Sequence, residues 1–394
     1  MMLRRRPWPA VAGATAVLLA AGCGTGGAEA PEEAAATPHG YVEGAEETAE
    51  PQWRLVMADT AAGTLHMLDP ATEEVTGAGA APGVAEAVTD GRFAFFGTGD
   101  AVTVLDTGTW TVDHGDHVHY YRAEARLVGE AEGSGTLQAV ADPAVTALSS
   151  DDGVRIIDRP ALEEGELSVT AVEGGGTALA YGQRLLVARA NGTVDVLDRD
   201  GAPADQTVGE RCPDPRGQAV TRRGAVIGCS DGALLVTEDD GTLTTERIPY
   251  PDQAGAGPVR SFQHRPGASV LAGPAGDEGI WVLDVGAREW THVETGPAVA
   301  TSAAGEDMPV LVLGADGTLR SYAPASGEQL AETELMDPPG DGGPAPAIRI
   351  DTTRAYVNDP LADAVHEIDY NDDLRLARTF DLGFSPDLMV ETGW

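Results

Sequence analysis

The chain has 394 residues, of which 63 are acidic and 25 are basic, so its formal net charge is −38 at pH 7. Every basic residue is an arginine, and lysine does not occur. This balance argues against nucleic-acid binding, which depends on basic patches that neutralise phosphates. An acidic surface suits cations, or simply keeps the protein in solution.

Residues 1–22 have the pattern of a secretory leader. Three arginines at positions 4–6 precede a short apolar run that ends in Ala-Ala-Gly directly before Cys23. Such a run is too short for a membrane span, which needs roughly 20 apolar residues. The end of the run resembles the lipobox of bacterial lipoproteins, so we expect Cys23 to be acylated and to anchor the protein at the extracytoplasmic face of the cell membrane. The alternative is a plain secreted protein.

Residues 23–50 are rich in Ala, Glu, Pro and Thr and contain almost no large apolar side chains. This composition predicts a disordered acidic tether between the lipid anchor and a folded domain. Its one histidine, His39, would bind cations only weakly, and an inert spacer is the simpler interpretation.

From residue 51 onward, one pattern of short β runs, a turn and an apolar stretch returns about every 35 to 50 residues, which is typical of a β-propeller. Its third strand is the clearest marker. Eight copies occur, at residues 63–69, 101–106, 153–158, 192–198, 233–238, 279–284, 317–322 and 364–369.

The first repeat lacks an inner strand before Trp53, whereas a spare strand, residues 386–391, follows the last repeat. Pairing this C-terminal strand into the first blade would close the ring and remove an open sheet edge. We therefore predict an all-β fold, a single eight-bladed propeller over residues 51–394. Seven blades are the alternative if one repeat is irregular.

In a four-stranded blade, the turns between the first and second strands all lie at one mouth of the channel. Most of the residues expected there are acidic, and one is a histidine: Asp90, Asp142, Arg222, His264, Glu306, Asp307, Asp351 and Glu391. The long connection of the second blade, residues 107–119, is expected to open on the same face.

That connection contains three of the eight histidines, His114, His117 and His119. In extended backbone, residues i and i+2 point to the same face, so His117 and His119 can bind one ion. Zinc prefers four ligands; we expect His264 as the third and Asp116 or a carboxylate of the mouth as the fourth, with His114 in reserve. The alternative is a set of hydrogen-bonding surface histidines.

Composition favours zinc over other metals at this cluster. The seven methionines are scattered and form no tract for Cu(I), and Ca²⁺ would prefer oxygen ligands. Ni²⁺ and Cu²⁺ would bind the same imidazoles and stay open as alternatives. The remaining cysteines, Cys212 and Cys229, form an even pair in an exported protein, which predicts one disulfide rather than a thiolate metal site.

Four short motifs carry a family resemblance: residues 115–120 (Gly-Asp-His-Val-His-Tyr), 262–265 (Phe-Gln-His-Arg), 212–213 (Cys-Pro) and 228–232 (Gly-Cys-Ser-Asp-Gly). With the repeats, they resemble the periplasmic zinc metallochaperones of the AztD type, β-propellers that pass zinc to the solute-binding protein of a zinc ABC transporter.

The resemblance implies that His117, His119 and His264 bind Zn²⁺, that the chain is not an enzyme, and that its partner is such a solute-binding protein. We further expect a monomer. The sequence departs from the family at two places. Arg265 stands where a second histidine is expected, and no histidine follows Cys212 closely, so a second zinc site there is in doubt.

Two other classes of function stay open. Propellers host many enzymes, so the fold alone decides nothing, and a metal-dependent hydrolase would use the same histidines with an open position for water. Against this, the chain has no Gly-x-Ser-x-Gly motif and no obvious general base beside the cluster. The third class is an interaction scaffold without metal.

Overall fold

The computed structural model describes residues 42, 44–114, 117–251, 256–340 and 342–394. The chain divides into two compact units, residues 1–39 and 40–394, and every described residue lies in the second. The predicted leader, the lipid anchor Cys23 and the tether as far as residue 41 therefore lie outside the described residues. Among the described helices, none is long and apolar enough to cross a membrane.

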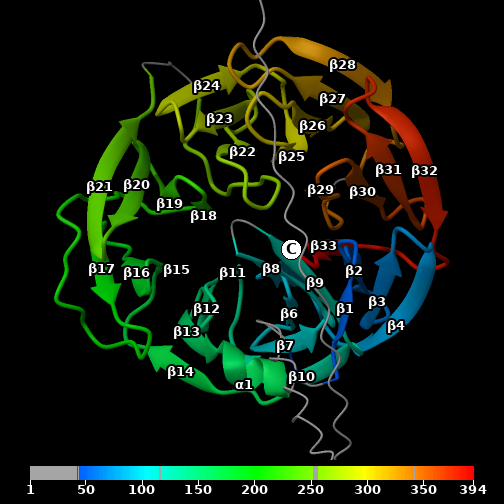
Figure 1. Ribbon diagram of the computed structural model, residues 1–394. Coiled ribbons are helices and arrows are strands. Elements are labelled where there is room, and N and C mark those ends of the chain that lie inside the picture. Colours follow the sequence, from blue (N-terminus) through cyan, green and yellow to red (C-terminus); the bar gives the residue numbers. More distant parts are fainter. Residues whose placement is uncertain (1–41, 43, 115–116, 252–255, 341) are drawn as a thin grey trace, which may run out of the picture. The chain divides into compact units, whose positions relative to one another are not determined.

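The described residues form small antiparallel sheets that follow one another in chain order around a common centre (Figure 1). We number eight of them sheet 1 to sheet 8. Sheets 1 and 2 contain β33 (Leu388–Thr392), β2 (Arg54–Asp59), β3 (Thr64–Asp69) and β4 (Glu74–Ala80), then β5 (Glu86–Thr89), β6 (Phe93–Gly97), β7 (Ala101–Asp106) and β10 (Arg126–Glu132). Sheets 3 and 4 contain β11 (Gln138–Ala141), β12 (Val145–Ser150), β13 (Gly153–Asp158) and β14 (Val169–Val172), then β15 (Thr177–Tyr181), β16 (Arg184–Ala188) and β17 (Val194–Leu197).

The second half of the chain continues the series. Sheets 5 and 6 contain β18 (Gln218–Thr221), β19 (Gly224–Cys229), β20 (Gly232–Asp239) and β21 (Thr242–Pro249), then β22 (Val270–Pro274), β23 (Ile280–Asp284) and β24 (Glu289–Val293). Sheets 7 and 8 contain β25 (Ala298–Ala303), β26 (Val310–Gly314), β27 (Thr318–Tyr322) and β28 (Gln329–Glu334), then β29 (Ile348–Ile350), β30 (Ala355–Asp359), β31 (Ala364–Asp369) and β32 (Arg375–Asp381).

Two further elements are inserted into this series. A ninth sheet, the hairpin sheet, contains β1 (Glu46–Thr48), β9 (Val118–Arg122) and β8 (Thr109–Asp113). The short helix α1 (Arg159–Glu164) follows β13; Asp158 caps its start and Gly165, with φ of 87°, ends it.

Burial explains why the strands have these sequences. The second and third strands of a sheet, such as β6 with five buried residues, are continuous apolar runs because neighbouring sheets cover both of their faces. The outer strand β21 alternates between exposed and half-buried residues, because one of its faces meets solvent. All eight stretches predicted as third strands are observed, as β3, β7, β13, β17, β20, β23, β27 and β31.

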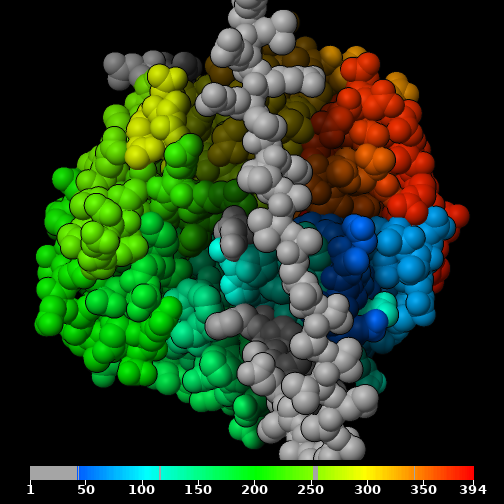
Figure 2. Space-filling model, in the orientation of Figure 1, coloured from blue at the N-terminus to red at the C-terminus, as the bar shows by residue number. Residues whose placement is uncertain are grey.

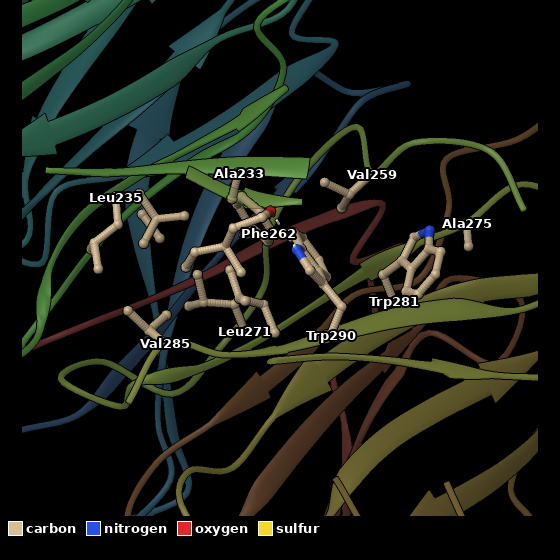
Figure 3. Close-up of a cluster of buried hydrophobic side chains, with 13 residues drawn as sticks. Ala233, Leu235, Val259, Phe262, Leu271, Ala275, Trp281, Val285 and Trp290 are labelled. Carbon is tan, nitrogen blue, oxygen red and sulfur yellow. Dashed lines mark hydrogen bonds between the residues drawn. The ribbon is translucent and has the colours of Figure 1, made fainter. Parts of the chain in front are cut away.

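Eight clusters of buried apolar side chains hold the sheets together, and seven of them draw on two sheets that are consecutive along the chain. The eighth cluster joins sheet 8 to sheet 1. Figure 3 shows the cluster between sheets 5 and 6, which includes Leu235, Trp281 and Trp290. The Trp290 Nε1–H donates a hydrogen bond to the Ile248 carbonyl oxygen at 3.0 Å, so its one polar atom is satisfied.

The predicted spare strand is observed as β33, and it pairs with β2 as the inner strand of sheet 1, with Met57 opposite Met389. Two predictions differ from the structure. Residues 46–48, at the end of the expected tether, form strand β1 because the free edge of β9 pairs with them. Most of the connection at 107–119, expected as a loop, belongs to the hairpin β8–β9.

Candidate metal centre

The histidine cluster lies at the tip of the hairpin β8–β9, which is inserted between β7 and β10 of sheet 2. Asp113 pairs with Val118 at the end of the ladder, and the His114 N–H donates a hydrogen bond to the His117 carbonyl oxygen at 3.0 Å. The hairpin projects from sheet 2 to the middle of the face shown (Figures 1 and 2).

Three imidazoles converge at this tip. One ring nitrogen from each of His114, His117 and His119 lies within 4.8 Å of the other two. The ring centroids are 4.8 Å apart for the pair 114 and 117, and 4.9 Å apart for the pair 117 and 119. Strand alternation places the side chains of His117 and His119 on one face, and the turn brings in His114. Imidazole nitrogen is a preferred zinc ligand, so this triad is the candidate metal centre.

A carboxylate from the N-terminal strand orients one member of the triad. Glu47 of β1 lies 2.7 Å from the His119 Nδ1, measured to its Oε1. A carboxylate bonded to one ring nitrogen fixes the orientation of the ring and leaves the other nitrogen for a metal. Glu47 could not be predicted as part of the site, because it lies in the expected tether and nothing in its sequence neighbourhood distinguishes it from the other glutamates there.

Buried contacts anchor the base of the hairpin. The Arg92 guanidinium lies 3.8 Å from the centre of the Trp110 ring, and both nitrogens of its fork bond Asp106 at 3.1 and 3.0 Å. Trp110 also stacks on Tyr121 from the opposite strand, with 5.3 Å between the ring centroids. The base is thus packed against sheet 2, whereas His114 and His117 at the tip are exposed.

The tip also contacts the opposite side of the molecule. Asp113 lies 3.8 Å from Arg222, which belongs to the turn between β18 and β19 of sheet 5. The hairpin inserted into sheet 2 therefore reaches a turn of sheet 5, whereas the predicted site required it to reach His264.

His264 lies elsewhere, in the wall of a central cavity of about 530 Å³. Burial, followed by the nearby charge of Arg265, lowers the pKa of His264 to about 4, so its ring is neutral at pH 7. Among the described residues, His264 is not a member of the metal-ligand group, which consists of the triad alone. His114, expected as a reserve, is in the triad, and Asp116 lies outside the described residues.

Two carboxylates of the acidic mouth are already paired with arginines. Asp90 accepts hydrogen bonds from Thr146 and from Arg159 at 2.5 and 2.6 Å. Asp142 is bound by the fork of Arg199 at 2.5 and 2.9 Å. These carboxylates join neighbouring sheets, so they contribute structure rather than cation-binding capacity.

The predicted disulfide between Cys212 and Cys229 is present and buried. It lies in the cluster between sheets 4 and 5. The pair therefore supplies no thiolate to a metal.

Fold and site together define a propeller-like all-β protein with a candidate metal centre on an inserted hairpin. No protein-family model matches the sequence. The chain is 22% identical over 305 residues to the zinc chaperone AztD of Citrobacter koseri, and the match covers 70% of each protein.

Solved structures agree with this comparison. The crystal structure of Citrobacter koseri AztD has a TM-score of 0.74 with this chain at 20% identity, and covers 87% of this chain and 98% of its own. The apo form of the same protein gives 0.73 at 19% identity, with the same coverage. The dihydro-heme d1 dehydrogenase NirN gives 0.56 at 16% identity, covering 88% of this chain and 76% of its own. The fold is shared, and the AztD resemblance predicted from the motifs is confirmed.

Proposed function

We propose that this protein is an extracytoplasmic zinc chaperone that holds Zn²⁺ at the hairpin triad and passes it to the solute-binding protein of a zinc ABC importer. The observation that carries the proposal is the convergence of His114, His117 and His119 at one exposed tip. The similarity to a protein named as a zinc chaperone supports zinc as the cargo.

The tip has the chemistry of a transfer site. Three imidazoles fill three of the four positions that zinc prefers and leave the fourth for another ligand. Because the tip is exposed, an acceptor can offer its own ligands while the histidines still hold the ion. Asp116 and His264 are the candidates for the fourth position within this chain. The named relative is a chaperone, and we propose no catalytic role here.

We further propose that sheets 1 to 8 are the eight blades of one closed, monomeric propeller. The pairing of β33 with β2 and the apolar cluster between sheets 8 and 1 support closure. We also propose a lipid anchor at Cys23, which would hold the propeller at the membrane beside an importer.

The zinc site is tested with metal-free protein spanning residues 24–394, titrated with zinc against a chromophoric chelator. We expect one tightly bound ion in the wild type and a loss of at least about a hundredfold in affinity for His117→Ala with His119→Ala, because two of the nitrogen ligands are removed. His66→Ala, which changes a histidine of β3 far from the hairpin in sequence, is the control. An unchanged isotherm for the double variant would exclude this site.

The chaperone role is tested by mixing zinc-loaded protein with the metal-free solute-binding protein of a zinc importer from the same organism. Direct transfer gives a rate that rises with acceptor concentration. A rate fixed by dissociation into bulk solvent, whatever the acceptor concentration, would contradict the proposal.

A further inference from the structure

A second cavity, of about 460 Å³, opens among three arginines, Arg222, Arg223 and Arg265. Arg222 and Arg223 form the turn between β18 and β19, and Arg265 precedes β22 of sheet 6. We call this cavity the arginine pocket. Glu306, the one carboxylate in its lining, offsets one of the three positive charges, so the pocket is cationic in a chain of net charge −38.

These arginines are less tied up in ion pairs than Arg92 and Arg159 are. Among the described residues, neither Arg223 nor Arg265 forms an ion pair; Arg265 Nε donates instead to the Ala304 carbonyl oxygen at 2.7 Å. Arg222 has Asp113 at 3.8 Å, and its side chain is 77% exposed. By contrast, the buried Arg92 and the half-buried Arg159 pair with carboxylates at 3.0 and 2.6 Å. The arginine pocket therefore keeps donors available for an external anion.

The position of the pocket links it to the metal centre. Arg222 contacts Asp113, and the next residue along the chain is His114 of the triad. A group bound at the arginine pocket thus lies beside the candidate zinc site.

We propose that the arginine pocket is the docking point for a carboxylate-bearing segment of the protein that receives zinc from the triad. The proposal rests on the proposed function and adds the chemistry of the partner. Guanidinium groups bind carboxylates in a planar, two-bond geometry. Because the chain is strongly acidic overall, a cationic pocket also orients the encounter with an acidic segment and speeds it at low salt.

The test compares two double variants with the same change in charge. Arg222→Glu with Arg223→Glu reverses the pocket. Arg211→Glu with Arg260→Glu is the control, because both arginines are exposed and neither lines the arginine pocket. Arg260 lies beside Gly217, before the start of β18, whereas Arg222 follows the end of that strand. Zinc affinity is measured first in both variants, because the Arg222→Glu change lies beside Asp113 and the triad, and association is then compared at zinc saturation.

Binding of each variant to the immobilised solute-binding protein is then measured by biolayer interferometry, and zinc transfer is measured separately. At low salt we expect association to slow about tenfold or more for the pocket variant and less than about twofold for the control. Added salt should slow the wild type and should not slow the pocket variant, because only repulsion between acidic surfaces is then left to screen.

Several outcomes would overturn the proposal: unchanged association in the pocket variant, an equal loss in both variants, or faster association in the pocket variant. The last would mean that an acidic segment of this chain itself occupies the pocket. If zinc binds and docking depends on the pocket but no zinc moves, the transfer function fails while the docking site stands.

Discussion

At the scale of single residues, the three histidines that are dense in one short segment lie close together, and one of them has a partner that is distant in sequence. His114, His117 and His119 are neighbours in sequence, so their convergence depends on one hairpin. Glu47 reaches His119 across 72 positions of the chain, through the pairing of β1 with β9. A contact of that kind leaves no local pattern in the sequence.

Glu47→Gln is expected to weaken zinc binding about tenfold or more, because loss of a carboxylate partner typically costs a metal-bound histidine 10- to 100-fold in affinity. The measurement is the competitive zinc titration. Glu46→Gln is the matched control, since Glu46 pairs with Arg122 and, among the described residues, has no hydrogen bond or ion pair with the triad. Equal affinities for Glu47→Gln and the wild type would show that Glu47 does not support the site.

A second residue, Glu391 of β33, predicts a pH dependence of stability. Burial, together with the nearby charge of Asp351, raises the pKa of Glu391 to about 8, and its Oε1 has no hydrogen-bond partner among the described residues. Between the ordinary pKa of 4.5 and about 8, the folded state holds a proton that the unfolded state releases. The free energy of unfolding therefore falls as pH rises through this window, by at most about 1.4 kcal/mol per pH unit.

Glu391→Gln keeps the shape of the side chain and removes its titratable group. The free energy of unfolding of this variant should therefore change less with pH than that of the wild type between pH 5 and 8. Urea unfolding followed at several pH values measures this. Glu328→Gln, at an exposed position, should leave the wild-type slope unchanged. Parallel curves for Glu391→Gln and the wild type would exclude a protonated Glu391.

At the scale of elements, the segment that was expected as a loop forms the hairpin β8–β9, which carries the histidine triad. A loop would have to fold inward to bring the histidines over the centre. The β8–β9 ladder and the Trp110–Tyr121 stack hold the tip in that position instead. Its start depends on Gly108, which has φ of 72° and lies against the Ala123 backbone, so a Cβ at this position would clash with that carbonyl oxygen.

Gly108→Ala should therefore displace the hairpin and lower zinc affinity about tenfold or more, while the sheets stay folded. Zinc titration and circular dichroism measure the two effects. Gly83→Ala is the control, because Gly83 has φ of 80° but open space around it, so it shares the backbone cost without the clash. Equal zinc affinity in the two variants would contradict this role for Gly108.

At the scale of the whole molecule, each repeat of the sequence pattern corresponds to one of sheets 1 to 8. The sheets are held by apolar clusters between neighbours, so most of the stability is distributed around the series. The disulfide is the covalent exception, and it links segments that pack between sheets 4 and 5.

Replacing Cys212 and Cys229 together by serine should lower the free energy of unfolding by about 3 kcal/mol, as expected for opening a loop of 17 residues. Chemical unfolding of oxidised wild type and variant measures the difference. Zinc affinity should be unchanged, because the triad lies at the tip of the hairpin β8–β9, whereas the disulfide lies in the cluster between sheets 4 and 5. A variant that is as stable as the wild type but binds zinc more weakly would contradict both expectations.

The sequence by itself determined the all-β class, the positions of the eight third strands, the spare C-terminal strand, the disulfide and the three clustered histidines. These features depend on local periodicity, turn residues and short spacings, which the order of amino acids carries directly. The tertiary structure alone decided that Glu47 supports His119, that Asp113 meets Arg222, and that Asp90 and Asp142 of the acidic mouth pair with arginines. Each of these contacts joins residues far apart in the chain, and only the packing of sheets around a common centre brings them together.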